Sequence, residues 1–324
     1  MQFKPEQTFA DVERLARAGR LQEAFGLMVA LAERDEPLAL FTLANFFWQG
    51  GPVDRDIVKA HSLFVRASAA GHADAHAFVT NLLGNGVLGE RDWRQALERL
   101  KVEANVDPYR RLALQVLQAM GVDSEGNPAS LPTGKPLSDK LDVAIFPALF
   151  SASECDLVLA AAEQRYQPST IHEANGREVP HPLRSSTGAP LHWLIEDPAL
   201  HALNRRLAAI TGTMYEQAEP MLVLRYAPGQ QYRPHLDALP GVANQRIVTA
   251  LVYLDDLYQG GETEFPHLGL KVKGERGDVL IFRNLAADGT AEPLSEHAGL
   301  PVISGVKHVA SRWIRQESMI PPTS

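Results

Sequence analysis

Two histidines and one aspartate in the C-terminal half have the residue types and the spacing of a divalent-metal site. His235 and Asp237 are separated by a single residue, and His297 follows 60 residues after Asp237. Side chains at positions i and i+2 of a strand point to the same face, so an imidazole and a carboxylate converge there if this segment is extended. Two imidazoles and one carboxylate form the facial arrangement that holds Fe(II) and leaves positions open for substrate and oxygen. The pattern therefore predicts an iron site with His235, Asp237 and His297 as ligands.

A lysine and two tyrosines indicate what else this site binds. Lys307 lies ten residues after His297, at the start of an apolar segment. A lysine there would usually extend its ammonium group to solvent, but an inward-pointing one needs an anion. Tyr226 and Tyr232 precede His235, and a phenol is a neutral donor that can share a carboxylate with the lysine. These residues predict a dicarboxylic co-substrate, with one carboxylate on Lys307 and the keto-acid end on the metal.

The N-terminal part of the chain predicts helices that repeat. From about residue 8 to 120, apolar residues recur at spacings of three and four. Ala24, Ala60 and Ala96 are each 36 residues apart, and so are Gly50 and Gly86. A repeat of this length fits a helix–turn–helix unit that buries its apolar face against its neighbours.

A second His-x-Asp triplet, His72 and Asp74, falls among these repeats. It lies at a junction between predicted helices, and no third ligand is in view. We therefore interpret it as a surface turn rather than a metal site.

The remainder of the chain changes character twice. Residues 121–142 are rich in Gly, Ser, Pro, Asp and Lys, which predicts a linker. Beyond it, short β-branched segments separated by Gly or Pro predict strands at 143–146, 221–226, 247–254, 270–272, 279–282 and 309–314, with helices near 153 and from 197 to 210. The predicted class is α+β, with domains at 1–120 and 143–324 and a sandwich or barrel in the second.

Composition limits the partners and the compartment. The chain has 324 residues, with 31 Lys and Arg against 39 Asp and Glu, a formal net charge of −8, so nucleic acid is not expected as a partner. Its one cysteine, Cys155, cannot form an internal disulfide. No apolar run approaches the roughly 20 residues that a membrane span needs. We expect a cytoplasmic protein without a membrane partner.

The helical part resembles a known repeat family. Residues 43–56 and 79–92 are similar to the Sel-one-like branch of tetratricopeptide repeats. The resemblance implies a superhelix that holds a peptide or protein partner. The alternative is a helical cap that only stabilises the second domain.

The tract from 143 to 315 resembles the catalytic domain of 2-oxoglutarate- and Fe(II)-dependent prolyl 4-hydroxylases. Beyond the triad and lysine, the shared motifs are Gln245-Arg246-x-x-Thr249, Tyr253-Leu254, Gly260-Gly-Glu-Thr-x-Phe265, Gly277-Asp278 and Arg312-Trp313. The resemblance implies a double-stranded β-helix, a jelly-roll-like barrel. It also implies that Tyr226, Thr263 and Lys307 bind 2-oxoglutarate and that Glu219, Tyr232, Arg246 and Trp313 contact the substrate. The loop from 171 to 182 matches no pattern, which leaves the substrate open.

The function expected from these features is the hydroxylation of a prolyl residue in a peptide or protein, coupled to oxidative decarboxylation of 2-oxoglutarate. Fe(II), 2-oxoglutarate, O2 and ascorbate are the expected cofactors, and the peptide is expected to dock on the repeats. One alternative is the same chemistry on a free amino acid or another small molecule. Another is a peptide-binding repeat scaffold with a non-catalytic barrel.

Overall fold

The computed structural model describes residues 7–172, 178–180 and 183–320, and it divides the chain into two compact units between Glu103 and Ala104. The predicted domain boundary at residue 120 therefore differs from the observed one. The reason is the helix α7 (Pro108–Ala119), which packs against α8 (Ala152–Ala162) and α9 (Pro198–Thr211) of the second unit. The Tyr109 hydroxyl of α7 donates a 2.5 Å hydrogen bond to the Asp197 carboxylate, which caps α9.

The first unit consists of helices in which sequential neighbours pack together. They are α1 (Phe9–Arg17), α2 (Leu21–Ala32), α3 (Pro37–Gln49), α4 (Ile57–Ala69), α5 (Ala73–Asn85) and α6 (Trp93–Glu103). Residues 36 apart have equivalent places: Ala24, Ala60 and Ala96 are all buried, and Gly50 and Gly86 end α3 and α5 with positive φ. The 36-residue repeat is thus a structural repeat.

The His72–Asp74 triplet begins a helix, as the sequence suggests. The His72 side chain caps α5 by accepting the Ala75 amide and stacks on Phe41 at 4.1 Å between ring centroids. The His72 side chain thus serves in capping and packing, and His72 and Asp74 belong to no group of candidate metal ligands among the described residues.

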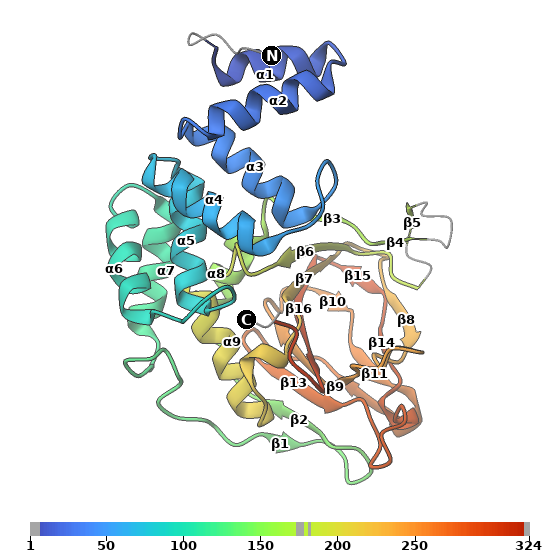
Figure 1. Ribbon diagram of the computed structural model, residues 1–324. Helices are drawn as coiled ribbons and strands as arrows, with labels where there is room; N and C mark the ends of the chain where they lie inside the picture. The colour runs from blue at the N-terminus through green and yellow to red at the C-terminus, as the bar shows by residue number, and fades with distance from the viewer. Residues whose placement is uncertain (1–6, 173–177, 181–182, 321–324) are drawn as a thin grey trace. The chain divides into compact units, whose positions relative to one another are not determined.

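The helices of the second unit are held to one another by buried ion pairs and caps. Ser151 and Glu154 form a capping box at the start of α8, and the Glu154 carboxylate also accepts two hydrogen bonds from Arg206 of α9 at 2.8 and 2.9 Å. Helix α8 in turn contacts strands β6 (Thr187–Leu191) and β7 (Met221–Tyr226) of the largest sheet. Figure 1 shows α8 and α9 beside this sheet.

Two antiparallel sheets form the barrel of the second unit (Figure 1). The main sheet has the order β1-β2-β13-β9-β16-β7-β6-β3, built from Lys135–Pro136, Val143–Phe146, Val279–Arg283, Arg246–Tyr253, Lys307–Arg315, Met221–Tyr226, Thr187–Leu191 and Gln167–Pro168. The smaller sheet has the order β12-β11-β14-β8, built from Leu270–Val272, Thr263–Phe265, His297–Gly299 and Tyr232–His235. Two further pairs are β10 (Gln259–Gly260) with β15 (Val302–Ser304) and β4 (Thr170–His172) with β5 (Glu178–Pro180).

The core lies between the two sheets. Leu224, Leu251 and Phe282 of the main sheet belong to one buried cluster with Phe265 and Val272 of the smaller sheet. This is the predicted double-stranded β-helix, and the α+β class is confirmed. None of the helices in the described part of the chain has the length and apolarity that crossing a membrane requires.

The segment predicted as a linker, 121–142, is part of the second unit. Its β1 extends the main sheet by pairing with β2, and Leu141 is buried in the barrel core. Its many turn residues suggested a linker, because a strand of only two residues is too short to be recognised from local composition. Of the unmatched loop 171–182, residues 173–177 and 181–182 lie outside the described residues.

Gly277 gives a test of this barrel. Its φ is +91°, and an added Cβ would lie 2.0 Å from the Phe150 carbonyl oxygen. Gly289 has a similar φ of +82° with nothing within 4 Å. We expect Gly289→Ala to cost about 1 kcal/mol of unfolding free energy, from backbone strain alone, and Gly277→Ala to cost about 3 kcal/mol or more. Urea denaturation of both variants measures this difference, and equal midpoints would contradict the packing of Gly277 on Phe150.

Candidate active site

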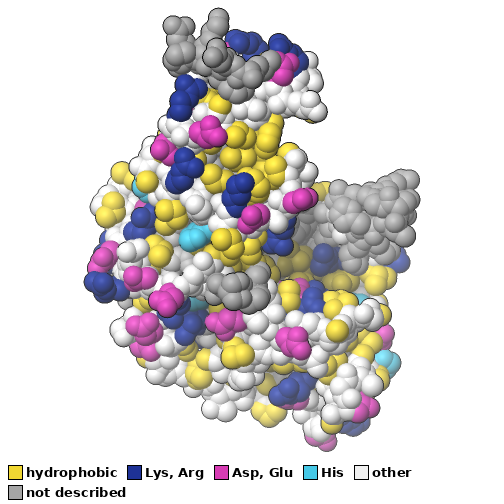
Figure 2. Space-filling model, viewed as in Figure 1, with side chains coloured by type: hydrophobic (Ala, Val, Ile, Leu, Met, Phe, Trp, Pro, Cys, Tyr) yellow, Lys and Arg dark blue, Asp and Glu magenta, His cyan; other side chains and the backbone are white. Residues whose placement is uncertain are grey.

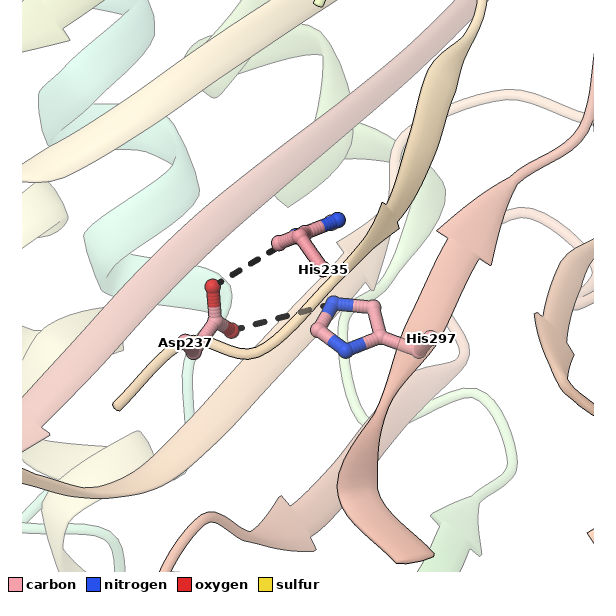
Figure 3. A group of neighbouring side chains, drawn as sticks. All are labelled: His235, Asp237 and His297. Carbon is pink, nitrogen blue, oxygen red and sulfur yellow. Dashed lines mark ion pairs between the residues drawn. The ribbon is translucent and has the colours of Figure 1, made fainter. Parts of the chain in front are cut away.

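The three predicted metal ligands come together at the edge of the smaller sheet. His235 ends β8, His297 begins β14, and the two residues are direct partners in the antiparallel register. Asp237 lies two residues past the end of β8. The candidate ligand atoms of the three side chains all lie within 4.8 Å of one another. In Figure 3 the Asp237 carboxylate faces both imidazoles, with its oxygens 3.6 Å from His235 Nε2 and 3.8 Å from His297 Nε2.

Backbone carbonyls fix the orientation of both rings. His235 Nδ1 lies 2.8 Å from the Arg233 carbonyl oxygen, and His297 Nδ1 lies 3.0 Å from that of Ser295. A carbonyl only accepts, so each Nδ1 carries a proton, which leaves Nε2 of each ring as the candidate metal-binding nitrogen. Such partners orient metal-binding histidines and set their tautomer.

The charge state of the triad suits a cation. Burial lowers the pKa of His297 to about 4, so its ring is neutral at pH 7. Burial alone would raise the pKa of Asp237, but His297, His235 and the Thr249 hydroxyl outweigh it and hold this pKa well below its usual value. Neutral imidazoles and an ionised carboxylate are the forms that bind a divalent metal.

The sequence reading missed the residues behind Asp237. The Thr249 hydroxyl donates to Asp237 Oδ2 at 2.7 Å, and the Asn284 amide donates to the Thr249 oxygen at 2.9 Å. All three side chains are buried. This chain of hydrogen bonds fixes the carboxylate through Oδ2, the same oxygen that faces His297. Thr249 was identified only as a motif residue, and Asn284 had no signal because its role depends on pairing between β13 and β9.

Lys307 points inward, into the barrel. Only 4% of the residue is exposed, and Nζ donates a 2.7 Å hydrogen bond to the Gly261 carbonyl. The ammonium also lies 5.7 Å from the ring centres of Tyr226 and Tyr253 and 6.0 Å from that of Tyr258. Among the described residues, no carboxylate forms an ion pair with it. Burial lowers its pKa to about 8.

One pocket joins the triad to this lysine. Its lining includes eight of the ten residues that the sequence predicted for the site. These are Tyr226, Tyr232, His235, Asp237, Thr263, His297, Lys307 and Trp313. The two remaining predicted residues, Glu219 and Arg246, are not in the lining. They form a bidentate ion pair at 2.7 and 2.8 Å, with the Arg246 guanidinium 4.1 Å from the Trp313 ring centre.

Tyr253 is a further residue of this region that the sequence did not assign. Its hydroxyl lies 2.9 Å from that of Thr263, and its ring lies against Lys307. The available signal was strand alternation: Thr249, Leu251 and Tyr253 share one face of β9, which is the face inside the barrel.

Comparison with known proteins agrees with this geometry. Residues 221–315 match the family model of the 2OG-Fe(II) oxygenase superfamily. Prolyl 4-hydroxylase 1 of Arabidopsis thaliana is 35% identical over 188 residues, which are 52% of this chain and 66% of that protein. Probable prolyl 4-hydroxylase 9 of the same plant is 31% identical over 220 residues, which are 61% and 76% of the two chains.

A similar solved structure is the viral collagen prolyl hydroxylase of Paramecium Bursaria Chlorella virus-1 in its 2OG complex. It has 26% sequence identity and a TM-score of 0.41, and the match covers 53% of this chain and 95% of that one. The sequence relatives, together with the matched oxygenase model, lead to one assignment. The chain belongs to the prolyl 4-hydroxylase family of 2-oxoglutarate- and Fe(II)-dependent dioxygenases.

Proposed function

We propose that this protein hydroxylates a prolyl residue of a peptide or protein substrate, using Fe(II), O2 and 2-oxoglutarate. The observation that carries the proposal is the Lys307 ammonium, which is buried without a carboxylate in the same pocket as the His235–Asp237–His297 triad. A buried ammonium of this kind is costly unless an anion joins it. A diacid whose other end reaches the metal supplies that anion.

The residues present fit the implied metal. Two neutral imidazoles and one carboxylate are the donor set of iron oxygenases that keep open positions. We propose His235, Asp237 and His297 as its ligands. When bound, Fe(II) with 2-oxoglutarate supplies the oxygen activation that replaces a C–H hydrogen by a hydroxyl group and yields succinate and carbon dioxide.

The chain's own residues bind, orient and exclude water. Lys307 would bind the far carboxylate of the co-substrate, with Tyr226 and Thr263 as neutral hydrogen-bond donors in the same pocket. Leu224, Leu251 and Val309 line the pocket with apolar surface, which keeps water from the reacting atoms.

Aromatic side chains near the metal fit a pyrrolidine ring. Tyr232 stacks on the His235 ring with 3.5 Å between centroids, and Trp313 lines the same pocket. Trp313 is held in turn by Arg246, which Glu219 fixes. We propose that Tyr232 and Trp313 contact the substrate directly and that Glu219 and Arg246 hold Trp313 in place.

Docking of the substrate on the helical repeats stays a prediction. Figure 2 shows hydrophobic side chains gathered over α3, where Phe41, Phe46 and Phe47 are each only partly buried. That surface supports a peptide-binding role for the first unit. The use of ascorbate and the cytoplasmic location also stay predictions.

The direct test is incubation of prolyl peptides with the protein, Fe(II), ascorbate and 2-oxoglutarate, followed by mass spectrometry. We expect one added oxygen atom on the prolyl residue, with an equal amount of succinate. Asp237→Ala is the control that should lose both products, because it removes a proposed metal ligand. Oxygen transfer to free proline in place of every peptide would contradict the peptide assignment and support the small-molecule alternative.

Lys307→Met tests the co-substrate site. Losing a hydrogen bond to a charged group costs roughly 1.5–3 kcal/mol, so 2-oxoglutarate should bind about ten- to a hundredfold more weakly in calorimetric titrations. Iron affinity should stay the same. Burial lowers the pKa of Lys307 to about 8, so at pH 7 the folded protein contains a buried charged lysine that reduces its stability. The ligand-free Lys307→Met variant lacks this charge and should melt at a higher temperature than the native protein at pH 7. Unchanged 2-oxoglutarate affinity would contradict the assignment.

Thr249→Val tests the support of Asp237. The substitution keeps the shape of the side chain but removes the donor to Oδ2, and the loss of such a partner typically weakens metal binding by about ten- to a hundredfold. Thr80→Val is a matched control, because the buried Thr80 hydroxyl also donates to a carboxylate, that of Glu103, within the first unit. Fe(II) titrations of both variants measure the effect, and equal affinities would show that Thr249 does not position the ligand.

A further inference from the structure

One carboxylate beside the pocket is shared by two guanidinium groups. Glu219 Oε1 accepts from Arg246 Nε at 2.7 Å and from Arg315 Nε at 2.5 Å, and Oε2 accepts from Arg246 Nη2 at 2.8 Å. The side chains of the three residues are only 11–16% exposed. The cluster therefore has two positive charges against one negative charge.

This cluster adjoins the proposed substrate position. The Arg246 guanidinium lies over Trp313, which lines the pocket. The excess positive charge thus lies at the wall that we propose to contact the prolyl residue.

The cluster also keeps donors available. Arg315 donates Nη1 to the Asn244 carbonyl at 2.6 Å, which leaves Nη2, while Arg246 leaves Nη1. Neither nitrogen bonds to another of the described residues. No second carboxylate pairs with the cluster in the described part of the chain. A partly buried, uncompensated guanidinium favours an incoming carboxylate, which it can bind through two donors.

We propose that Arg315, together with Arg246, binds a carboxylate of the substrate next to the reacting prolyl residue, so that the preferred substrate has an acidic residue beside that proline. The proposal rests on the proposed function, because it concerns the same site. Arg315 is then a specificity-determining residue. A C-terminal carboxylate, or that of free proline, has the same chemistry and must be separated by experiment.

The test compares peptides that differ in one group. Each pair consists of two peptides of equal length with one proline, which is flanked by Glu in one peptide and by Gln in the other. In the first pair the flanking residue precedes the proline, and in the second pair it follows the proline. At low salt, KM for the Glu peptide should be about tenfold lower in one of the two pairs. The difference should shrink as salt screens the contact.

Variants assign the preference to Arg315. In Arg315→Gln the ratio of the Gln-peptide KM to the Glu-peptide KM should fall to within about twofold, and taking a ratio cancels any general loss of activity. Arg315→Lys keeps the charge and should keep much of the preference. Arg283→Gln removes the same charge from an exposed ion pair with Asp142 and should leave the ratio at its native value.

Each outcome decides the proposal. Equal KM values for Glu and Gln peptides in the native protein, with both peptides hydroxylated, would overturn it while leaving the proposed function intact. A preference found only for a peptide ending in a free carboxylate over its amide, or only for free proline, would overturn the acidic-residue assignment. Absence of prolyl hydroxylation in every arm would instead refute the proposed function.

Discussion

The antiparallel register between β8 and β14 is the constraint on which the site depends. It places His235 directly opposite His297, although 62 residues separate them in the sequence. Asp237 reaches the same point because the chain continues two residues past the strand. A slip of one residue in either strand would turn one imidazole to the other face. The proposed iron site therefore depends on strand pairing as much as on residue type.

A second register sets the depth of the pocket. Lys307 pairs with Tyr226 at the start of β16, so the ammonium lies inside the barrel among aromatic rings. Burial disfavours the charged form of this lysine and lowers its pKa, so the position is unfavourable in the ligand-free protein. The same burial strengthens the attraction for an anion that enters the pocket. This lysine thus reduces the stability of the ligand-free protein at the position where we propose that a diacid binds.

Two hydrogen-bonded groups of polar side chains support the residues that line the pocket. Asn284, Thr249 and Asp237 form one such group at the triad, and Glu219 with its two arginines forms another behind Trp313. The side chains of both groups are buried or nearly so, and therefore solvent screens their interactions only weakly. Side chains held in this way keep their positions when a ligand arrives, which is what catalysis by placement requires.

The sequence by itself determined the residue types of the chemistry and the class of fold. The spacing of His235, Asp237 and His297 predicted the triad, and strand alternation together with the family motifs predicted the barrel. The tertiary structure decided the rest. It assigned α7 to the second unit, because the Tyr109–Asp197 contact joins residues 88 apart. It also linked Asn284 through Thr249 to Asp237 and added Arg315 to the Glu219 ion pair. These contacts link strands distant in sequence, and a local pattern contains no information about which side chains meet across a barrel.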